Sequence, residues 1–82
     1  EEYLNSNIVV FPVPSAGVVY VQVNGTEITS YDVYDLQGRL MLSAQETNLK
    51  VVKLDKETLG SGTFIINVQT PIGEVQRKMI IQ

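Results

Sequence analysis

The stretch Thr63-Phe64-Ile65-Ile66-Asn67-Val68-Gln69 decides the fold class of this chain. Successive side chains of a β-strand point to opposite faces, so Phe64, Ile66 and Val68 share one apolar face while the polar residues share the other. No long segment of the sequence repeats with the 3.6-residue period of a helix. The stretch is therefore interpreted as a strand of an all-β protein, with its apolar face in the core.

The same alternation predicts six further strands, bounded by the Gly, Pro, Asn and Asp residues that favour turns. A bulge or bend is expected near Ser30, because Ile28 falls out of phase with the inward-facing Tyr31 and Val33. The seven predicted strands are residues 8–11, 18–23, 28–34, 39–44, 50–54, 63–69 and 75–81. The predicted core residues are Val19, Val21, Val33, Val52, Leu54, Phe64, Ile66 and Val68.

Turn signals give the connections between these strands. Asn24-Gly25 is the strongest hairpin signal, since both residues tolerate positive φ, and hairpins are also expected at Leu36-Gln37-Gly38 and Pro71-Ile72-Gly73. The connections on either side of strand 50–54 are longer and are expected to cross between two sheets. The second of them should contain one helical turn, residues 55–59, with Asp55 as its cap. This wiring predicts a seven-stranded, Greek-key, immunoglobulin-like β-sandwich.

Composition limits the functions that the chain can have. Its 82 residues are enough for one domain. The absence of Cys and His removes disulfides, thiolate metal sites and the commonest general base. A net charge of −3 gives no basic footprint for nucleic acid, and the apolar runs are too short to span a membrane. We therefore expect no cofactor, no nucleic-acid partner and no direct membrane insertion.

Several side chains could carry chemistry, but each has a simpler interpretation. Asp32, Asp35, Asp55 and Glu57 could bind calcium or act as acid and base, yet Asp at strand ends usually bonds its own backbone. The serines lack a visible activating partner, so we expect no enzyme activity. Asn24-Gly25-Thr26 matches a glycosylation sequon, but the same residues make a good turn.

Four short motifs remain, and each has a physical role in the fold. Two prolines in the first motif fix a rigid entry segment, Gly38 allows the positive φ of a tight turn, and Gly62 lets the chain enter the strand that Phe64 anchors. The motifs are Phe11-Pro12-Val13-Pro14, Tyr34-Asp35-Leu36-Gln37-Gly38-Arg39, Leu59-Gly60-Ser61-Gly62-Thr63-Phe64 and Lys78-Met79-Ile80-Ile81-Gln82.

With these motifs in this order, residues 7–82 resemble the C-terminal sorting domain of the type IX secretion system, in its immunoglobulin-like type A form. The family opens with an aromatic-Pro-Asn-Pro element, and Val13 stands here where asparagine is usual. The family motifs place structural residues at Pro12, Pro14, Tyr34, Asp35, Gly38, Leu59, Gly62 and Phe64. The residues expected to act in recognition or translocation are Lys78, Met79, Ile80, Ile81 and Gln82.

The resemblance implies a function without catalysis. Residues 1–7 would be a linker from an upstream cargo domain, and residues 8–82 the sorting domain. The cargo would reach the periplasm of a Gram-negative bacterium and pass through the outer-membrane translocon to the cell surface or the medium. A surface sortase would then cut in or before residues 1–7. The implied partners are the translocon proteins, the sortase and the cargo.

Two alternatives stay open at this point. The chain could instead be a passive accessory β-sandwich, a carbohydrate-binding or spacer module of an extracellular enzyme. An exposed row of aromatic residues would favour that function, and Tyr20 and Tyr34 alone do not make one. The terminal segment is either an accessible strand edge for docking or a final core strand. We predict that deleting residues 78–82 blocks export more than it lowers stability, since fraying ends contribute little to a core.

Overall fold

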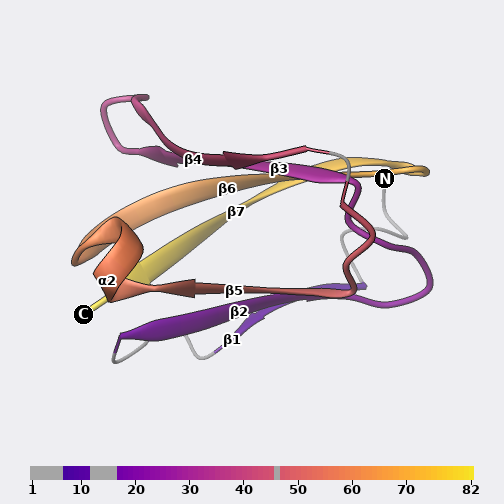
Figure 1. The fold of residues 1–82 in the computed structure, drawn as a ribbon, viewed down its shortest axis with the longest axis horizontal. Helices are drawn as coiled ribbons and strands as arrows, with labels where there is room; N and C mark the ends of the chain where they lie inside the picture. Colours follow the sequence, from indigo (N-terminus) through magenta and orange to yellow (C-terminus); the bar gives the residue numbers. More distant parts are fainter. Residues whose placement is uncertain (1–6, 12–16, 46) are drawn as a thin grey trace.

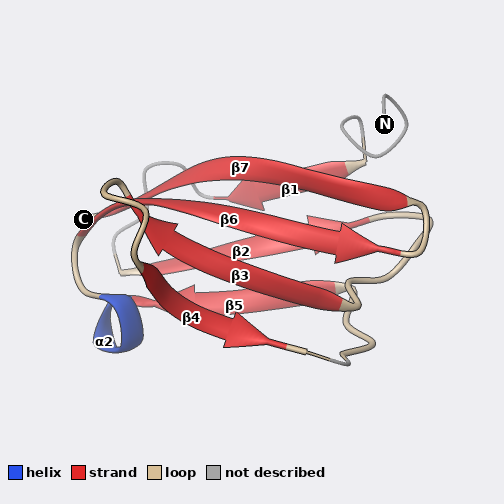
Figure 2. Cartoon of the chain, turned by 90° about the horizontal axis from the view of Figure 1, so that it is seen from above, coloured by secondary structure: helices blue, strands red, loops and turns tan. Residues whose placement is uncertain are grey.

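The computed structural model describes residues 7–11, 17–45 and 47–82, which form two antiparallel β-sheets packed face to face (Figures 1 and 2). One sheet contains, in order, β1 (Ile8–Phe11), β2 (Val18–Val23) and β5 (Val51–Asp55). The other contains β4 (Leu40–Ala44), β3 (Ser30–Asp35), β6 (Gly62–Thr70) and β7 (Gly73–Ile81). One helical turn, α2 (Lys56–Leu59), joins β5 to β6. The predicted seven-stranded, all-β sandwich is confirmed.

The wiring is that of an immunoglobulin-like sandwich with its fourth strand in the second sheet. In a constant-type immunoglobulin domain the fourth strand pairs within the first sheet. Here the turn at residues 36–38 folds β4 directly back on β3, so that Tyr31 pairs with Ala44 and Val33 with Leu42. The chain then crosses to β5 in the first sheet and returns through α2 to β6, as predicted.

The core lies between the two sheets and contains all eight of the residues predicted for it. The exposed fraction of Phe64 is 4 %, and the other seven are at most 3 % exposed. The alternation was a reliable guide because each of these residues lies on the inner face of a strand that pairs on at least one side. Seven further apolar residues complete the core: Ile8, Val23, Ile28, Leu59, Val75, Met79 and Ile81.

The hairpin predicted at Asn24-Gly25 is wrong. The strand before it, β2, pairs with β1 and β5, whereas β3 after it pairs with β4 and β6 in the other sheet. Gly25 does have the positive φ expected of a turn, 80°. The physical reason for the error is that a turn fixes the local reversal of the chain and leaves open which sheet the next strand joins. The connection carries the chain between sheets.

A change of pairing partner explains the phase shift expected near Ser30. Ile28 is fully buried and exchanges backbone hydrogen bonds with Leu49, on the segment that leads into β5. The N–H of Thr29 already donates to Gln69 of the second sheet, at 2.8 Å. The pairing of β3 with β6 is regular from Ser30 onward, so the bulge expected near Ser30 is absent. The register shifts between β3 and β4 instead: Val33 pairs with Leu42 and Tyr34 with Leu40, so Met41 of β4 is the extra residue.

The end of the chain is a core strand. β7 pairs along its whole length with β6 and lies at the edge of the second sheet. Met79 is 0 % exposed and Ile81 is 1 % exposed. The expectation that residues 78–82 fray and contribute little to stability is therefore wrong, because two of the five side chains fill the space between the sheets.

Candidate functional site

Parts of three of the four sequence motifs come together at one end of the sandwich, on the left in Figure 1. We call this the motif end and define it by residues 36–39, 59–64 and 79–82. Strand pairing joins them, because Asp35 pairs with Phe64 and Gly62 pairs with Ile81. Phe11, the described residue of the first motif, ends β1 on the same side of the molecule. Segments distant in sequence thus form one surface.

The opposite end carries the start of β1. There the backbone N–H of Asn24 donates to the carbonyl oxygen of Asn7, at 2.9 Å. The connections at residues 24–29 and 45–50 and the turn at residues 71–72 lie at this end too (Figure 1). The molecule is 31 Å long along its longest axis. Asn7, immediately before β1, therefore lies on the side away from the motif end.

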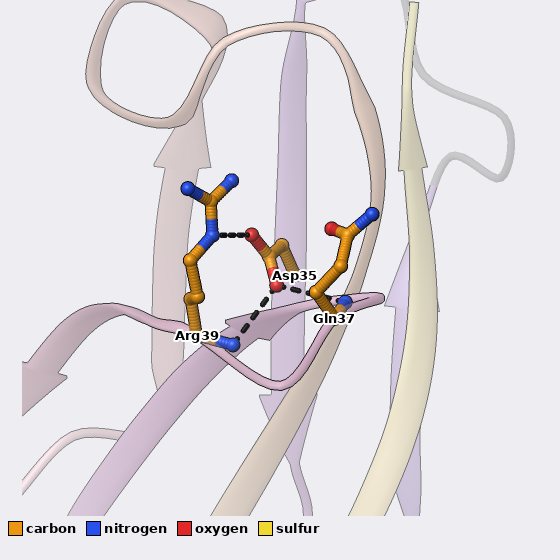
Figure 3. A network of polar contacts seen from close by, with 3 residues as sticks. All are labelled: Asp35, Gln37 and Arg39. Carbon is orange, nitrogen blue, oxygen red and sulfur yellow. Dashed lines mark hydrogen bonds and ion pairs between the residues drawn. The ribbon is translucent and has the colours of Figure 1, made fainter.

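Asp35 organises the turn between β3 and β4 (Figure 3). Its Oδ1 accepts hydrogen bonds from the backbone N–H groups of Gln37 and Arg39, both at 2.9 Å, and its Oδ2 accepts one from Arg39 Nε at 2.7 Å. The carbonyl oxygen of Asp35 accepts from Gly38 N at 3.0 Å. Gly38 has a φ of 87°, a backbone conformation that residues with a side chain rarely adopt. The motif is thus a closed, hydrogen-bonded turn.

These contacts hold the Asp35 carboxylate in its ionised form. The hydrogen bond from the backbone N–H of Arg39 has the largest effect, and the guanidinium of Arg39 and the N–H of Gln37 add to it. Together they outweigh the opposing effect of burial. The pKa of Asp35 therefore lies below its ordinary value of 3.8.

The Asp35 turn forms one wall of the motif end, and the segment that follows α2 forms the other. The Asp55 carboxylate caps this helix by accepting from Thr58 N at 2.9 Å, as predicted. The N–H of Gly60 donates to the carbonyl oxygen of Lys56 and closes the turn. Leu59, 6 % exposed, anchors the segment in the core. Residues 60–62 are consequently held beside the Asp35 turn.

A shallow concavity of about 300 Å³ lies between these two walls. We call it the motif-end pocket. Leu59 and Phe64, both buried, lie beneath it, and Leu36 and Met41 are exposed apolar residues on its rim. The side chain of Arg39 is 77 % exposed. The described residues that line it are Asp35, Leu36, Gln37, Arg39, Met41, Leu59, Ser61, Gly62, Thr63 and Phe64.

A family model for the secretion system C-terminal sorting domain matches residues 9–82. The chain belongs to this family. The match begins in β1 and includes all four motifs, so the resemblance to type IX secretion sorting domains is confirmed. A search of curated proteins finds no sequence that matches the chain.

The sorting domain places its predicted motif residues in different surroundings. Asp35, Leu59, Gly62 and Phe64 line the motif-end pocket, and Gly38 lies in the turn that Asp35 holds. Tyr34 lies half-buried on the outer face of the second sheet, where it pairs with Leu40 and Ile65. Pro12 and Pro14 lie outside the described residues. In the terminal segment Lys78 and Gln82 are exposed, Ile80 is half-buried, and Met79 and Ile81 are in the core.

Two of the four acidic residues singled out in the sequence, Asp35 and Asp55, bond the local backbone as their sequence context indicated. Asp35 holds a turn, Asp55 caps α2, and Asp32 accepts a hydrogen bond from Ser43 at 2.7 Å. Among the described residues, no three of the types His, Cys, Asp and Glu gather as a metal site would require. Within the same residues, no helix has the length and apolar character to cross a membrane.

Sequence reasoning did not single out Arg39, Leu36 and Met41 as site residues. Arg39 and Leu36 belong to a recognised motif, but their exposure beside Ser61 and Gly62 depends on β3 pairing with β6. Met41 stands outside every motif. It lines the pocket and is the extra residue of β4, since Tyr34 pairs with Leu40 and Val33 pairs with Leu42.

Proposed function

We propose that this sorting domain directs an attached cargo protein across the outer membrane through the type IX translocon. The observation that carries the proposal is the family match over residues 9–82, joined to the gathering of the family motifs at one end of the fold. Because the motif residues meet only in the folded domain, the machinery would recognise a folded surface. The cargo would be attached at the opposite end, where it leaves the motif end accessible.

The domain would be a substrate of the secretion pathway and have no activity of its own. After translocation, a cell-surface sortase would cleave a peptide bond in or before residues 1–7 and release the domain from the cargo. The cargo would therefore pass through the periplasm and finish on the cell surface or in the medium. Sorting domains are not a catalytic family, in keeping with this role.

The terminal segment can take part in recognition only through some of its residues. Met79 and Ile81 are enclosed in the core and support the fold. Lys78 and Gln82 are exposed, and Ile80 lies on the outer side of β7 opposite Thr63. We assign contact with the translocon to these three, beside the motif-end pocket.

The test is a secreted fusion. A periplasmic reporter with a signal peptide is joined to residues 1–82 and expressed in a type IX-secreting strain and in its translocon-deficient derivative. We expect the reporter at the surface or in the medium only in the secreting strain. The exported reporter should be shorter than the fusion by about the mass of the domain. Reporter retained in the periplasm of the secreting strain would overturn the proposal. A matched fusion without residues 8–82 controls for leakage.

One observation favours the alternative of a carbohydrate-binding module. Phe11 and Tyr20 lie side by side on the outer face of the first sheet, with ring centroids 5.6 Å apart and an interplanar angle of 27°. The rings stack on one another, so each has one face already covered and offers less surface to a sugar. Affinity electrophoresis in gels containing cell-surface or plant polysaccharides tests this function, and retardation abolished by Tyr20→Ala would support it.

A further inference from the structure

We propose that Arg39 is a carboxylate-binding residue, and that the motif-end pocket takes an acidic side chain from an extended segment of a secretion-machinery protein. The proposal rests on the sorting function proposed above and names the partner chemistry of its recognition surface. It follows from how Arg39 is held, from the apolar surface around it and from the charges that the pocket lacks.

Arg39 is fixed at one edge of its guanidinium and open at the other. Its Nε donates to Asp35 Oδ2 at 2.7 Å, while its own backbone N–H donates to Asp35 Oδ1 at 2.9 Å. Figure 3 shows the two terminal nitrogens pointing away from the carboxylate. No residue in the described part of the chain accepts a hydrogen bond from them. The free edge can therefore donate two parallel hydrogen bonds to an incoming carboxylate.

Fixing the guanidinium in advance favours binding over a merely structural role. An arginine that is already oriented loses less conformational freedom when it binds. A surface ion pair alone contributes little to stability, and the turn keeps its two backbone hydrogen bonds to Asp35 without the guanidinium. The bond to Asp35 is thus better explained as positioning Arg39 than as holding the turn.

The apolar rim fits a protein segment. Leu36 is 67 % exposed and Met41 is 40 % exposed, and both line the pocket beside Arg39. Arginine and methionine are enriched where proteins meet one another, and apolar neighbours that exclude water strengthen an arginine–carboxylate bond. A partner segment would lay apolar side chains on Leu36 and Met41 and its carboxylate on Arg39.

The charges argue against an anionic lipid as the occupant. Recognition of an acidic membrane surface takes a cluster of roughly four to eight basic residues. Arg39 is the one base among the described residues that line the pocket, and Asp35 beside it balances its charge. A single oriented guanidinium matches a single carboxylate.

The experiment compares Arg39→Gln with Lys50→Gln in the reporter fusion. Lys50 is exposed at the opposite end, so both variants lose one positive charge and only one alters the pocket. We expect both isolated domains to melt within a few degrees of the parent. The initial rate of reporter appearance at the surface should fall about tenfold or more for Arg39→Gln and stay near the parent for Lys50→Gln. Arg39→Lys, which keeps the charge and loses the planar fork, should be intermediate.

Three outcomes would overturn the inference. Equal export of the two glutamine variants would show that the guanidinium is dispensable, while export of the parent fusion would leave the sorting function intact. A fall in export that parallels a fall in melting temperature for Arg39→Gln would make the residue structural. Cosedimentation of the parent domain with vesicles containing anionic lipid, lost in Arg39→Gln, would assign the site to a membrane.

Discussion

Asp35 links the local chemistry of the chain to the proposed recognition surface. One oxygen of the carboxylate bonds the backbone of the turn, and the other bonds the side chain of Arg39. The same group therefore shapes the turn and aims the guanidinium over the motif-end pocket. Because the carboxylate must be ionised to accept all of these bonds, both effects depend on pH.

We predict that Asp35→Asn reduces the acid sensitivity of the domain. The folded-state pKa of Asp35 lies below 3.8, so its contribution to the free energy of unfolding is fully present above pH 3.8. It is lost as the pH falls through the lower folded-state value. Denaturant unfolding measured from about pH 6 down to pH 2 should show that the free energy of unfolding declines less steeply in the variant than in the parent.

Part of the decline should remain in Asp35→Asn. Hydrogen bonds from the side chain and then the backbone N–H of Thr58 also lower the pKa of Asp55, which caps α2. In the double variant Asp35→Asn/Asp55→Asn, the free energy of unfolding should depend on pH even less. Parallel curves for the parent and Asp35→Asn would contradict the assigned role of the carboxylate.

We predict that Gly38→Val lowers the free energy of unfolding by about 1–2 kcal/mol. An added Cβ would meet nothing within 4 Å, so the effect comes from the backbone, held at φ of 87°. Gly38→Asn is the matched variant, because asparagine tolerates this conformation better. Urea unfolding of the two isolated domains measures the difference. A Gly38→Val domain as stable as the Gly38→Asn domain would mean that the turn can change its conformation without penalty.

Among the strands, β7 shows how core and signal overlap. It supplies Met79 and Ile81 to the core and pairs with the Leu59–Phe64 motif through Gly62 and Phe64. Its exposed Lys78 and half-buried Ile80 belong to the surface proposed for recognition. Deletions within β7 therefore cannot separate folding from recognition, whereas substitutions of its exposed side chains can.

We predict that Met79→Ala lowers the free energy of unfolding by about 2–5 kcal/mol, since the side chain is fully buried. Deleting residues 78–82 removes Ile81 and several strand hydrogen bonds as well. The whole free energy of unfolding of a domain is only about 5–15 kcal/mol, so we expect that deletion to unfold it. Deleting Gln82 alone, an exposed residue, should leave the melting temperature nearly unchanged. A cooperative melt near that of the parent after the five-residue deletion would refute this placement of β7.

Local patterns predicted the strands of this domain, and they did not predict how the strands associate. Val19, Val21 and Phe64 were assigned to the core correctly because alternation depends only on neighbouring residues. The assignment of Asn24-Gly25 to a hairpin failed because the partner of β3 is fixed by the distant strand β6. The motif-end pocket was beyond prediction for the same reason. Its walls are 20 or more residues apart in sequence and meet through the pairing of Asp35 with Phe64.

Taken as one body, the sandwich has two ends, to which the proposed function gives different tasks. The proposed recognition surface lies at the motif end, and the chain enters at the opposite end, along a molecule 31 Å long. Surface changes should therefore affect export according to the end on which they fall.

Two exposed apolar turn residues make a matched pair for this prediction. Leu36 lies at the motif end and is 67 % exposed, and Ile72 lies at the opposite end and is 50 % exposed. We expect Leu36→Ser to slow export of the reporter fusion several-fold and Ile72→Ser to leave it unchanged. Both domains should melt like the parent, because exposed substitutions usually change stability by less than about 0.5 kcal/mol. Equal export rates would mean that the two ends are not distinguished.

The position of β7 in the sheet has a consequence for protein synthesis. Gly62 and Thr63 obtain their strand partners only when Ile80 and Ile81 have emerged from the ribosome and β7 has paired with β6. A polypeptide whose translation stops anywhere before Met79 carries an incomplete core and an unformed motif end. Under the proposed function, such an aborted product would lack a readable export signal. The fold would thus act as a proofreading step, in which only cargo translated through β7 leaves the cell.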